Sequence, residues 1–277
     1  MRVTEFMRFF AIVALATASL SCGRASAAII FSDNFESGSM ANWTQTTATA
    51  GTSLVISNAQ NIVPAGGTNS ASMDNSADRM HRNIIADNGG SEVTGNSRFV
   101  SWIYDDGQTG SGGANRVWNE VRGYSGGTGL PNGGITASGT LSQLFAIGKH
   151  NSVTAPGEVH TNTKYQARSL SGSLVGFFNL NGPSSPNRSI GWHKFTVERL
   201  ADNTTINFYV DDLLSRTVTG TTAQTWDTIV MGPGTGTQAG TTWIDGVQVE
   251  VIPEPATLAL AGIGLIGVCC VSRGKNA

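Results

Sequence analysis

The stretch that decides the fold is residues 193–210, which read HKFTVERLADNTTINFYV. Phe195 and Val197 alternate with polar residues in its first part, and the same alternation returns at 205–210. A period of two residues places alternate side chains on opposite faces of a β-strand. The intervening Ala201-Asp202-Asn203 segment carries residues that favour turns. The stretch therefore predicts a β-hairpin with one buried face.

Short alternating runs of the same kind recur on both sides of this hairpin, and no sustained 3.6-residue period interrupts them between Ile29 and Val251. Many short strands without helices are typical of antiparallel architectures. We therefore expect an all-β body at residues 28–250, folded as an antiparallel jelly-roll β-sandwich. Its further strands are predicted at residues 28–31, 53–57, 98–103, 144–148, 164–170, 174–179, 226–231 and 242–251.

A glycine-rich region at 110–139 interrupts this pattern, because it has several Gly-Gly pairs and few apolar residues. It is interpreted as long surface loops around one short strand near 117–122. Just before it, Asp105-Asp106-Gly107 has the composition of a hairpin turn.

Three short motifs carry a resemblance to known sandwiches. Residues 30–38, followed by Trp43, resemble the opening strand of jelly-roll carbohydrate-binding and laminin-G-like domains. Residues 191–195 with 208–212 resemble a hairpin of concanavalin A-like lectin/glucanase domains, although Asp212 stands where that family usually has glycine. Residues 243–247 resemble their last strand, while 60–160 are unmatched. The resemblance implies a sandwich that binds or cleaves carbohydrate.

Charge and cysteine content narrow the function further. Five of the 17 basic residues and two of the 19 acidic ones lie in the terminal segments, which leaves the body with a net charge near −5. An acidic body has no electrostatic footprint for nucleic acid. Cys22, Cys269 and Cys270 are the three cysteines of the chain, so the body has no disulfide. Core burial and sheet pairing must stabilise it.

The first 27 residues have the parts of a secretion signal. Arg2 and Arg8 supply positive charge, and residues 9–20 form a 12-residue apolar segment. Ala25-Ser26-Ala27 is a small-x-small site at which signal peptidase would cut before Ala28. Two alternatives stay open, a lipoprotein processed at Cys22 and a buried N-terminal helix.

The C-terminal segment at 251–277 has three parts in order. Pro253-Glu254-Pro255 cannot continue a strand and predicts an extended hinge. The uncharged stretch at 256–271 has 16 residues and predicts one short transmembrane helix. Arg273 and Lys275 follow it and mark the cytoplasmic side of an inner membrane.

These residues resemble the PEP-CTERM sorting signal, also called the ice-binding protein C-terminal domain. The resemblance implies processing by an exosortase in a Gram-negative-type bacterium that makes extracellular polysaccharide. It also implies transient anchoring in the inner membrane, followed by release to the cell surface or matrix. The basic end is weaker than in the family, because Gly274 interrupts it. A plain membrane anchor is the alternative. Ice binding is not expected, because Thr-x-Thr pairs occur without a fixed repeat.

Catalytic residues are not expected. Retaining glucanases of this architecture need two carboxylates about 5–5.5 Å apart, which strands supply at positions i and i+2 or i+4. Glu120 and Glu198 stand alone, and the adjacent Asp211 and Asp212 face opposite sides of a strand. The body has neither a Gly-x-Ser-x-Gly elbow nor a cysteine nucleophile, and its histidines lack metal-ligand spacing.

Two sets of residues are candidates for binding. Asp33, Glu36 and Asp245 would supply hard oxygen ligands for a structural calcium ion if the first and last strands pair. The alternative is that these three carboxylates cap turns. The second set comprises aromatic residues that could stack on sugar rings, with the interior of the sandwich as the alternative place for them. These residues are Trp102, Tyr104, Trp118 and Tyr124.

The sequence therefore favours an exported surface or matrix protein that binds, or is embedded in, extracellular polysaccharide without catalysis. A polysaccharide-active glycosidase or lyase of the same fold is the first alternative. A purely structural domain without a ligand is the second.

Overall fold

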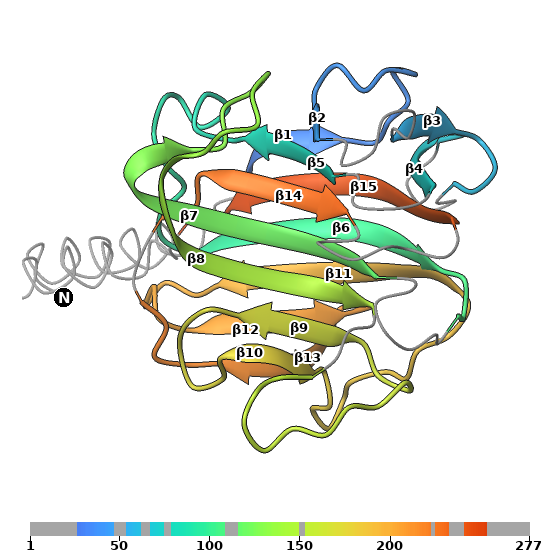
Figure 1. Cartoon of the computed structure of the whole chain (residues 1–277), viewed down its shortest axis with the longest axis vertical. Helices are drawn as coiled ribbons and strands as arrows, with labels where there is room; N and C mark the ends of the chain where they lie inside the picture. The colour runs from blue at the N-terminus through green and yellow to red at the C-terminus, as the bar shows by residue number, and fades with distance from the viewer. Residues whose placement is uncertain are drawn as a thin grey trace, which may run out of the picture. The chain divides into compact units, whose positions relative to one another are not determined.

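The computed structural model describes residues 27–46, 54–61, 67–74, 79–108, 116–149, 153–222, 225–232 and 241–253. All named elements in these ranges are β-strands (Figure 1), which confirms the all-β prediction. The predicted secretion signal, apart from Ala27, and the predicted transmembrane segment at 256–271 lie outside the described residues. Within the described ranges, no helix has the length and hydrophobicity needed to cross a membrane.

The strands form two antiparallel sheets within one compact unit, Ala28–Val251. The strands of sheet A are β1 (Ala28–Asp33), β3 (Val55–Ser57), β4 (Ser70–Asp74), β6 (Ser97–Asp105), β11 (Gly191–Arg199), β12 (Ile206–Val210), β13 (Leu213–Val218) and β15 (Thr241–Val251). The strands of sheet B are β2 (Thr44–Thr46), β5 (Arg79–Asn83), β7 (Val117–Gly129), β8 (Ser138–Lys149), β9 (Gln166–Ser169), β10 (Gly176–Asn179) and β14 (Thr228–Gly232).

The two sheets lie face to face. In Figure 1, β7 and β8 of sheet B lie in front of β6 and β11 of sheet A. Sheet A has the order β13-β12-β11-β6-β15-β4-β3, with β1 also paired to β15, and sheet B has the order β10-β9-β8-β7-β14-β5-β2. Two antiparallel sheets packed face to face confirm the β-sandwich architecture expected from the sequence.

The hairpin predicted at 193–210 is β11 with β12. Thr196 pairs with Tyr209, and Phe195 and Val197 are buried between the sheets. The next connection, from β12 to β13, is the two residues Asp211 and Asp212, which have φ values of 52° and 63°. Two consecutive left-handed residues form the type I′ turn that suits a twisted hairpin. Aspartate tolerates this conformation, so Asp212 can replace the glycine of the resembling family.

The first and last strands pair, as the sequence-based argument assumed. β1 is antiparallel to the C-terminal half of β15, with Asp33 opposite Val247. β4 pairs with the N-terminal half of β15, and β6 lies along its other side. Strands from both ends of the body therefore pair with each other in sheet A.

The core lies between the sheets and draws on alternate residues of each strand. On β6, Phe99 and Ile103 point into it, and on β8 Phe145 and Ile147 do so. Rings meet across the two sheets: the Phe178 and Phe208 centroids are 5.8 Å apart in an edge-on arrangement. Burying each such side chain contributes about 1.5–3 kcal/mol, which lets the body fold without a disulfide.

The glycine-rich region differs from the loop interpretation. β7 continues to Gly129 and pairs with β8, which begins at Ser138, with two register irregularities along the way. Gly123 and Gly127 leave no room for a Cβ, because the backbones of Thr225 and Ser138 lie against them. These glycines belong to a bulged strand in which another backbone approaches closely.

The hairpin-turn interpretation of Asp105-Asp106-Gly107 is wrong. Asp105 is the last residue of β6 in sheet A, whereas the next strand, β7, belongs to sheet B. The segment therefore leaves one sheet for the other instead of turning back on itself. Gly107 N does donate a hydrogen bond to Asp105 Oδ1 (2.9 Å), but the Asp105 carboxylate is buried and serves an ion network.

Candidate functional site

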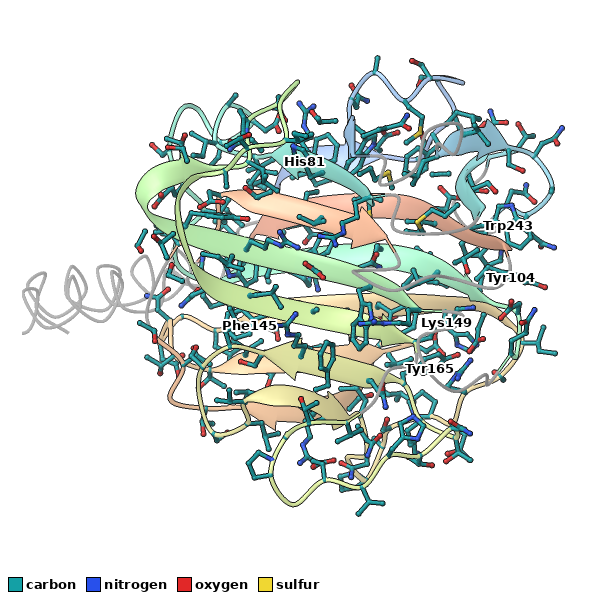
Figure 2. The ribbon with its side chains drawn as sticks, viewed as in Figure 1. His81, Tyr104, Phe145, Lys149, Tyr165 and Trp243 are labelled. Atoms are coloured by element: carbon teal, nitrogen blue, oxygen red, sulfur yellow. The ribbon has the colours of Figure 1, made fainter. Side chains whose placement is uncertain are left out.

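An aromatic cluster covers one end of the outer face of sheet A. Phe99 and Ile103 of β6 point into the core, so Trp102 and Tyr104 point outward on the same strand. Tyr104 pairs with Trp192 of β11, and it contacts Trp243 of β15. We call Trp192, Tyr104 and Trp243 the aromatic row; Figure 2 shows Tyr104 and Trp243 at the same end of the body.

The rings of the aromatic row support each other edge to face. The Tyr104 centroid is 5.7 Å from that of Trp192 and 5.5 Å from that of Trp243, at interplanar angles of 76° and 89°. All three residues are partly exposed. Each edge-to-face contact contributes about 0.5–1.5 kcal/mol beyond burial, so the row is preorganised in the absence of a ligand.

Trp102 extends the cluster along β6 and depends on a glycine in β15. A Cβ on Gly246 would lie 2.8 Å from Trp102 Cδ1, and Gly246 has a φ of +55°. Glycine is thus needed both for the backbone conformation and for the space that the indole occupies. Trp243 Nε1 reaches Ser57 Oγ at 3.4 Å, whereas Trp192 Nε1 has no hydrogen-bond partner among the described residues.

The other two predicted aromatic residues lie on the opposite side of the sandwich. Trp118 and Tyr124 are on β7, and both point outward from sheet B, away from the core residues Val117 and Val121. Only 2% of Trp118 and 8% of Tyr124 is exposed. The four aromatic residues therefore belong to two separate places, and only Trp102 and Tyr104 share one.

The three predicted calcium ligands are engaged in hydrogen bonds inside the protein. Asp33 accepts from Phe35 N (2.8 Å) and Trp43 Nε1 (2.9 Å), and Glu36 Oε1 accepts from the backbone of residues 68 and 69. Asp245 Oδ1 accepts from the following backbone N–H at 2.6 Å. In the part of the chain that the structure describes, no three His, Cys, Asp or Glu side chains are grouped to hold a metal ion. Calcium binding stays a prediction, and these bonds fit the turn-capping alternative.

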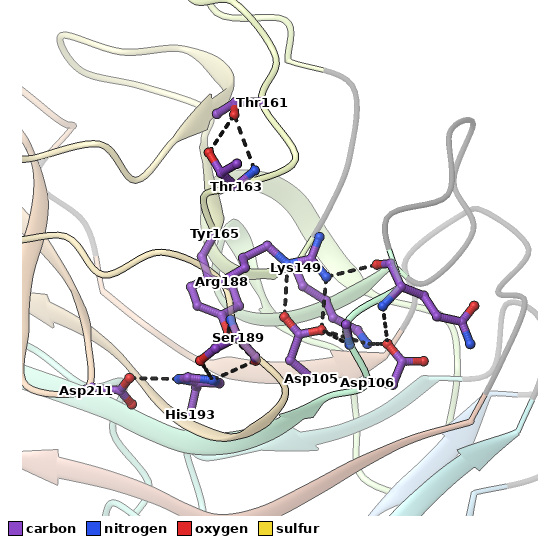
Figure 3. A network of polar contacts seen from close by, with 12 residues as sticks. Asp105, Asp106, Lys149, Thr161, Thr163, Tyr165, Arg188, Ser189, His193 and Asp211 are labelled. Atoms are coloured by element: carbon purple, nitrogen blue, oxygen red, sulfur yellow. Dashed lines mark hydrogen bonds and ion pairs between the residues drawn. The ribbon is translucent and has the colours of Figure 1, made fainter.

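A network of polar side chains lies at the end of β6, next to the start of β11 (Figure 3). Asp105 accepts two hydrogen bonds of 2.9 Å from Arg188, and Lys149 Nζ lies 2.8 Å from Asp106 Oδ1. Burial alone would raise the pKa of Asp105, but Arg188 and Lys149 outweigh it and hold that pKa below its usual value. Burial of Tyr165 next to Asp105 raises the pKa of the phenol. The network joins β6 of sheet A to β8 of sheet B and serves stability.

His193 lies in the same network in an arrangement that resembles a Ser-His-Asp triad. Its Nδ1 donates to Asp211 Oδ2 (2.7 Å), and its Nε2 lies 3.1 Å from Ser189 Oγ (Figure 3). Nε2 is, however, nearer to the carbonyl oxygen of Ser189, at 2.9 Å. Asp211 and the Ser189 carbonyl can only accept, so both contacts are satisfied by a ring that is protonated on both nitrogens. In that state neither nitrogen can take the serine proton as a general base. The sequence-based interpretation of His193 as a strand residue agrees with this.

Sequence reasoning did not select Trp192 and Trp243 as site residues. In the sequence both stand only within the motifs that resemble lectin-like sandwiches. The period-two pattern already assigns Trp192 to the face opposite Phe195, so the outward direction could have been predicted. Their neighbourhood could not, because it depends on β11, β6 and β15 lying side by side, and these strands are far apart in the sequence.

Comparison with known proteins identifies the C-terminal segment. Residues 251–273 match the PEP-CTERM protein-sorting motif family. They are a PEP-CTERM sorting motif. Such a motif implies export and processing by an exosortase. The match covers less than a tenth of the chain and gives no family for the body. No curated protein sequence matches the chain.

Solved structures resemble the body only remotely. A carbohydrate esterase of the Shiga toxin-encoding bacteriophage phi24B is 12% identical, with a TM-score of 0.49, over 82% of this chain and 100% of that one. Domain 4 of AbnA, an extracellular arabinanase from Geobacillus stearothermophilus solved with arabinotriose, is 10% identical, with a TM-score of 0.46 over 82% and 93%. A Bacillus licheniformis β-glucanase is 12% identical, with a TM-score of 0.42 over 83% and 99%. Likeness at this level carries no argument about activity or family.

Proposed function

We propose that the chain is an exosortase-sorted surface or matrix protein whose body, Ala28–Val251, binds extracellular polysaccharide without catalysis. The aromatic row carries the proposal. Partly exposed rings held at fixed angles are the feature with which proteins bind the apolar faces of sugar rings. Delivery through a PEP-CTERM motif at 251–273 would bring this surface to the cell exterior.

The charge arrangement supports binding over hydrolysis. Glu120 is the carboxylate that lines a pocket on the outer face of sheet B, and it forms an ion pair with Arg122. Within the described residues that line this pocket, no second carboxylate stands near it as a nucleophile or base. Ser189 and His193 do not form a working nucleophile–base pair, for the reason given above. A glycosidase or lyase remains the alternative, and an activity assay separates the two proposals.

The test uses residues 28–253, which contain every described strand and one continuous core. This fragment should bind at least one neutral glycan on an array. Tyr104→Ala should weaken that binding about fivefold, since one lost ring contact costs on the order of 1 kcal/mol. Tyr209→Ala is the matched control. Tyr209 is a partly exposed tyrosine on β12 of the same sheet, and it donates to Glu198 outside the row.

Two outcomes would contradict the proposal. If Tyr104→Ala and Tyr209→Ala bind equally well while both remain folded, the aromatic row is not the binding surface. If the fragment releases new reducing ends or unsaturated sugars from a bound polysaccharide, the protein is an enzyme.

A further inference from the structure

A pocket of about 300 Å³ opens on the outer face of sheet B, the side of the sandwich away from the aromatic row. Its lining residues come from several strands of that sheet, between β10 and β5 in the strand order. Arg122 comes from β7, Arg168 from β9 and Arg79 from β5, while Arg116 directly precedes β7. Glu120 is the only acidic residue among the lining residues that the structure describes. The described lining therefore holds four arginines and one glutamate, although the body as a whole is acidic.

Cations elsewhere in the described body have partners. Six of them form ion pairs with carboxylates, as Arg82 does with Asp87 and Arg98 with Glu250. Lys164 donates to a backbone carbonyl, and Arg199 donates to two. Unpaired positive charge is thus not a general property of this surface.

Inside the pocket the compensation is incomplete. Arg122 pairs with Glu120 and donates from Nη1 to Tyr124 Oη at 3.3 Å. Arg168 lies over the Phe177 ring, 4.8 Å from its centroid, and forms no ion pair with a described residue. Arg116 Nε is buried and has no hydrogen-bond partner among the described residues. A buried guanidinium donor without an acceptor, such as Arg116 Nε, is costly unless a ligand supplies one.

The pKa shifts of two pocket arginines also favour an anionic ligand. Burial first, and then the charge of Arg168, lower the pKa of Arg116. Burial likewise lowers the pKa of Arg79, with the charge of Glu120 opposing that effect and the charge of Arg122 adding to it. Like charges held together out of water favour any anion that enters between them.

We propose that this pocket binds the anionic group of an acidic sugar, a carboxylate or a sulfate ester, within an extracellular polysaccharide. The planar donors of Arg116 and Arg168 suit the paired oxygens of such groups. Trp118 and Phe177 form an apolar wall for the ring that carries the group, and the volume is at the small end of ligand pockets. The choice of a glycan rests on the proposed function, whereas the anion preference rests on the arginines alone.

The test measures binding of residues 28–253 to polygalacturonate, dextran sulfate and neutral dextran at about physiological salt. The fragment should bind at least one of the two acidic polymers more tightly than neutral dextran, and the tighter one identifies carboxylate or sulfate as the group. Arg168→Gln and Arg116→Gln should each weaken this binding about tenfold or more, as expected for a lost charge-assisted hydrogen bond.

Arg98→Gln is the matched control, because it removes the same charge from β6 on the opposite sheet. It should leave acidic-polymer binding unchanged. Absence of binding to both acidic polymers overturns the inference, and so does an equal effect of the three substitutions. Tyr104→Ala separates the two proposals, because it should leave acidic-polymer binding unchanged. If the fragment binds acidic polymers but no neutral glycan, the proposed function fails while the inference about the arginine pocket stands.

Discussion

Tyr104 and His193 show how one alternating pattern gives neighbouring side chains opposite roles. Tyr104 lies on the outer face of sheet A beside Trp192, the residue that precedes His193. His193 points inward, where it contacts Tyr165 and donates to Asp211. The outward residues form the proposed binding surface, and the inward ones fix the strand that presents them. The face of the sheet to which each side chain points could be predicted from the sequence, whereas the residues that it contacts could not.

The protonation of His193 gives a testable pH dependence. Burial would lower the pKa of His193, but the hydrogen bond and charge of Asp211, together with the Ser189 carbonyl, outweigh it and raise that pKa. A raised pKa means that this contribution to folding is complete below the unfolded value of about 6.5 and is lost as pH rises through the folded pKa. The stability difference between the wild type and His193→Gln should therefore shrink from pH 6 to pH 9. Chemical denaturation at several pH values measures it.

Asp211→Asn is the companion variant, because it removes the charge and keeps the shape. The titration of the His193 ring, followed by NMR, should move to lower pH in this variant. A folded-state pKa for His193 below 6.5 in the wild type would contradict the assignment of two proton donors. It would also reopen Ser189 as a nucleophile.

β7 and β8 show where sequence patterns stop being informative. The pattern at 193–210 predicts β11 and β12 because both have apolar residues on one face and a turn between them. The second half of β7 has no such pattern, since Gly123 and Gly127 lie where another backbone approaches too closely for a side chain. That close approach depends on Thr225 and Ser138, which a local pattern does not identify. A strand whose glycines allow another backbone segment to approach closely is therefore predicted as a loop from its sequence.

The grouping of the aromatic row could not be predicted from the sequence for the same reason. It spans β11, β6 and β15, whose order in sheet A is set by pairings between distant segments. Trp102 and Tyr104 share one face of a single strand, and Trp118 and Tyr124 are close to them only in sequence. The structure places this second pair on sheet B, where Trp118 lines the arginine pocket.

The sandwich and the sorting motif meet at the end of β15. The compact unit ends at Val251, and the PEP-CTERM match begins at the same residue. Pro253 lacks the N–H that a further ladder bond would need. A cut at or near Pro253-Glu254-Pro255 would therefore leave every described strand intact. On this account, sorting and binding are separable properties of the chain.

Replacing Pro253-Glu254-Pro255 with three alanines tests the sorting half in the native host. The full-length variant should accumulate in the inner membrane, because exosortase recognition is lost while the apolar stretch at 256–271 remains. Deletion of 256–277 is the control, and it should release the body without membrane residence. Fractionation and immunoblotting report both. Export of the alanine variant at the wild-type level would show that the segment is only an anchor.

The binding half is tested most directly by the indole N–H signals of the six tryptophans during a glycan titration. Trp43 and Trp226 are buried in the core, Trp118 lines the arginine pocket, and the other three belong to the aromatic cluster on sheet A. A neutral glycan found on the array should shift the signals of Trp102, Trp192 and Trp243 and leave those of Trp43 and Trp226 in place. A neutral glycan that binds while these three signals stay unchanged would contradict the account.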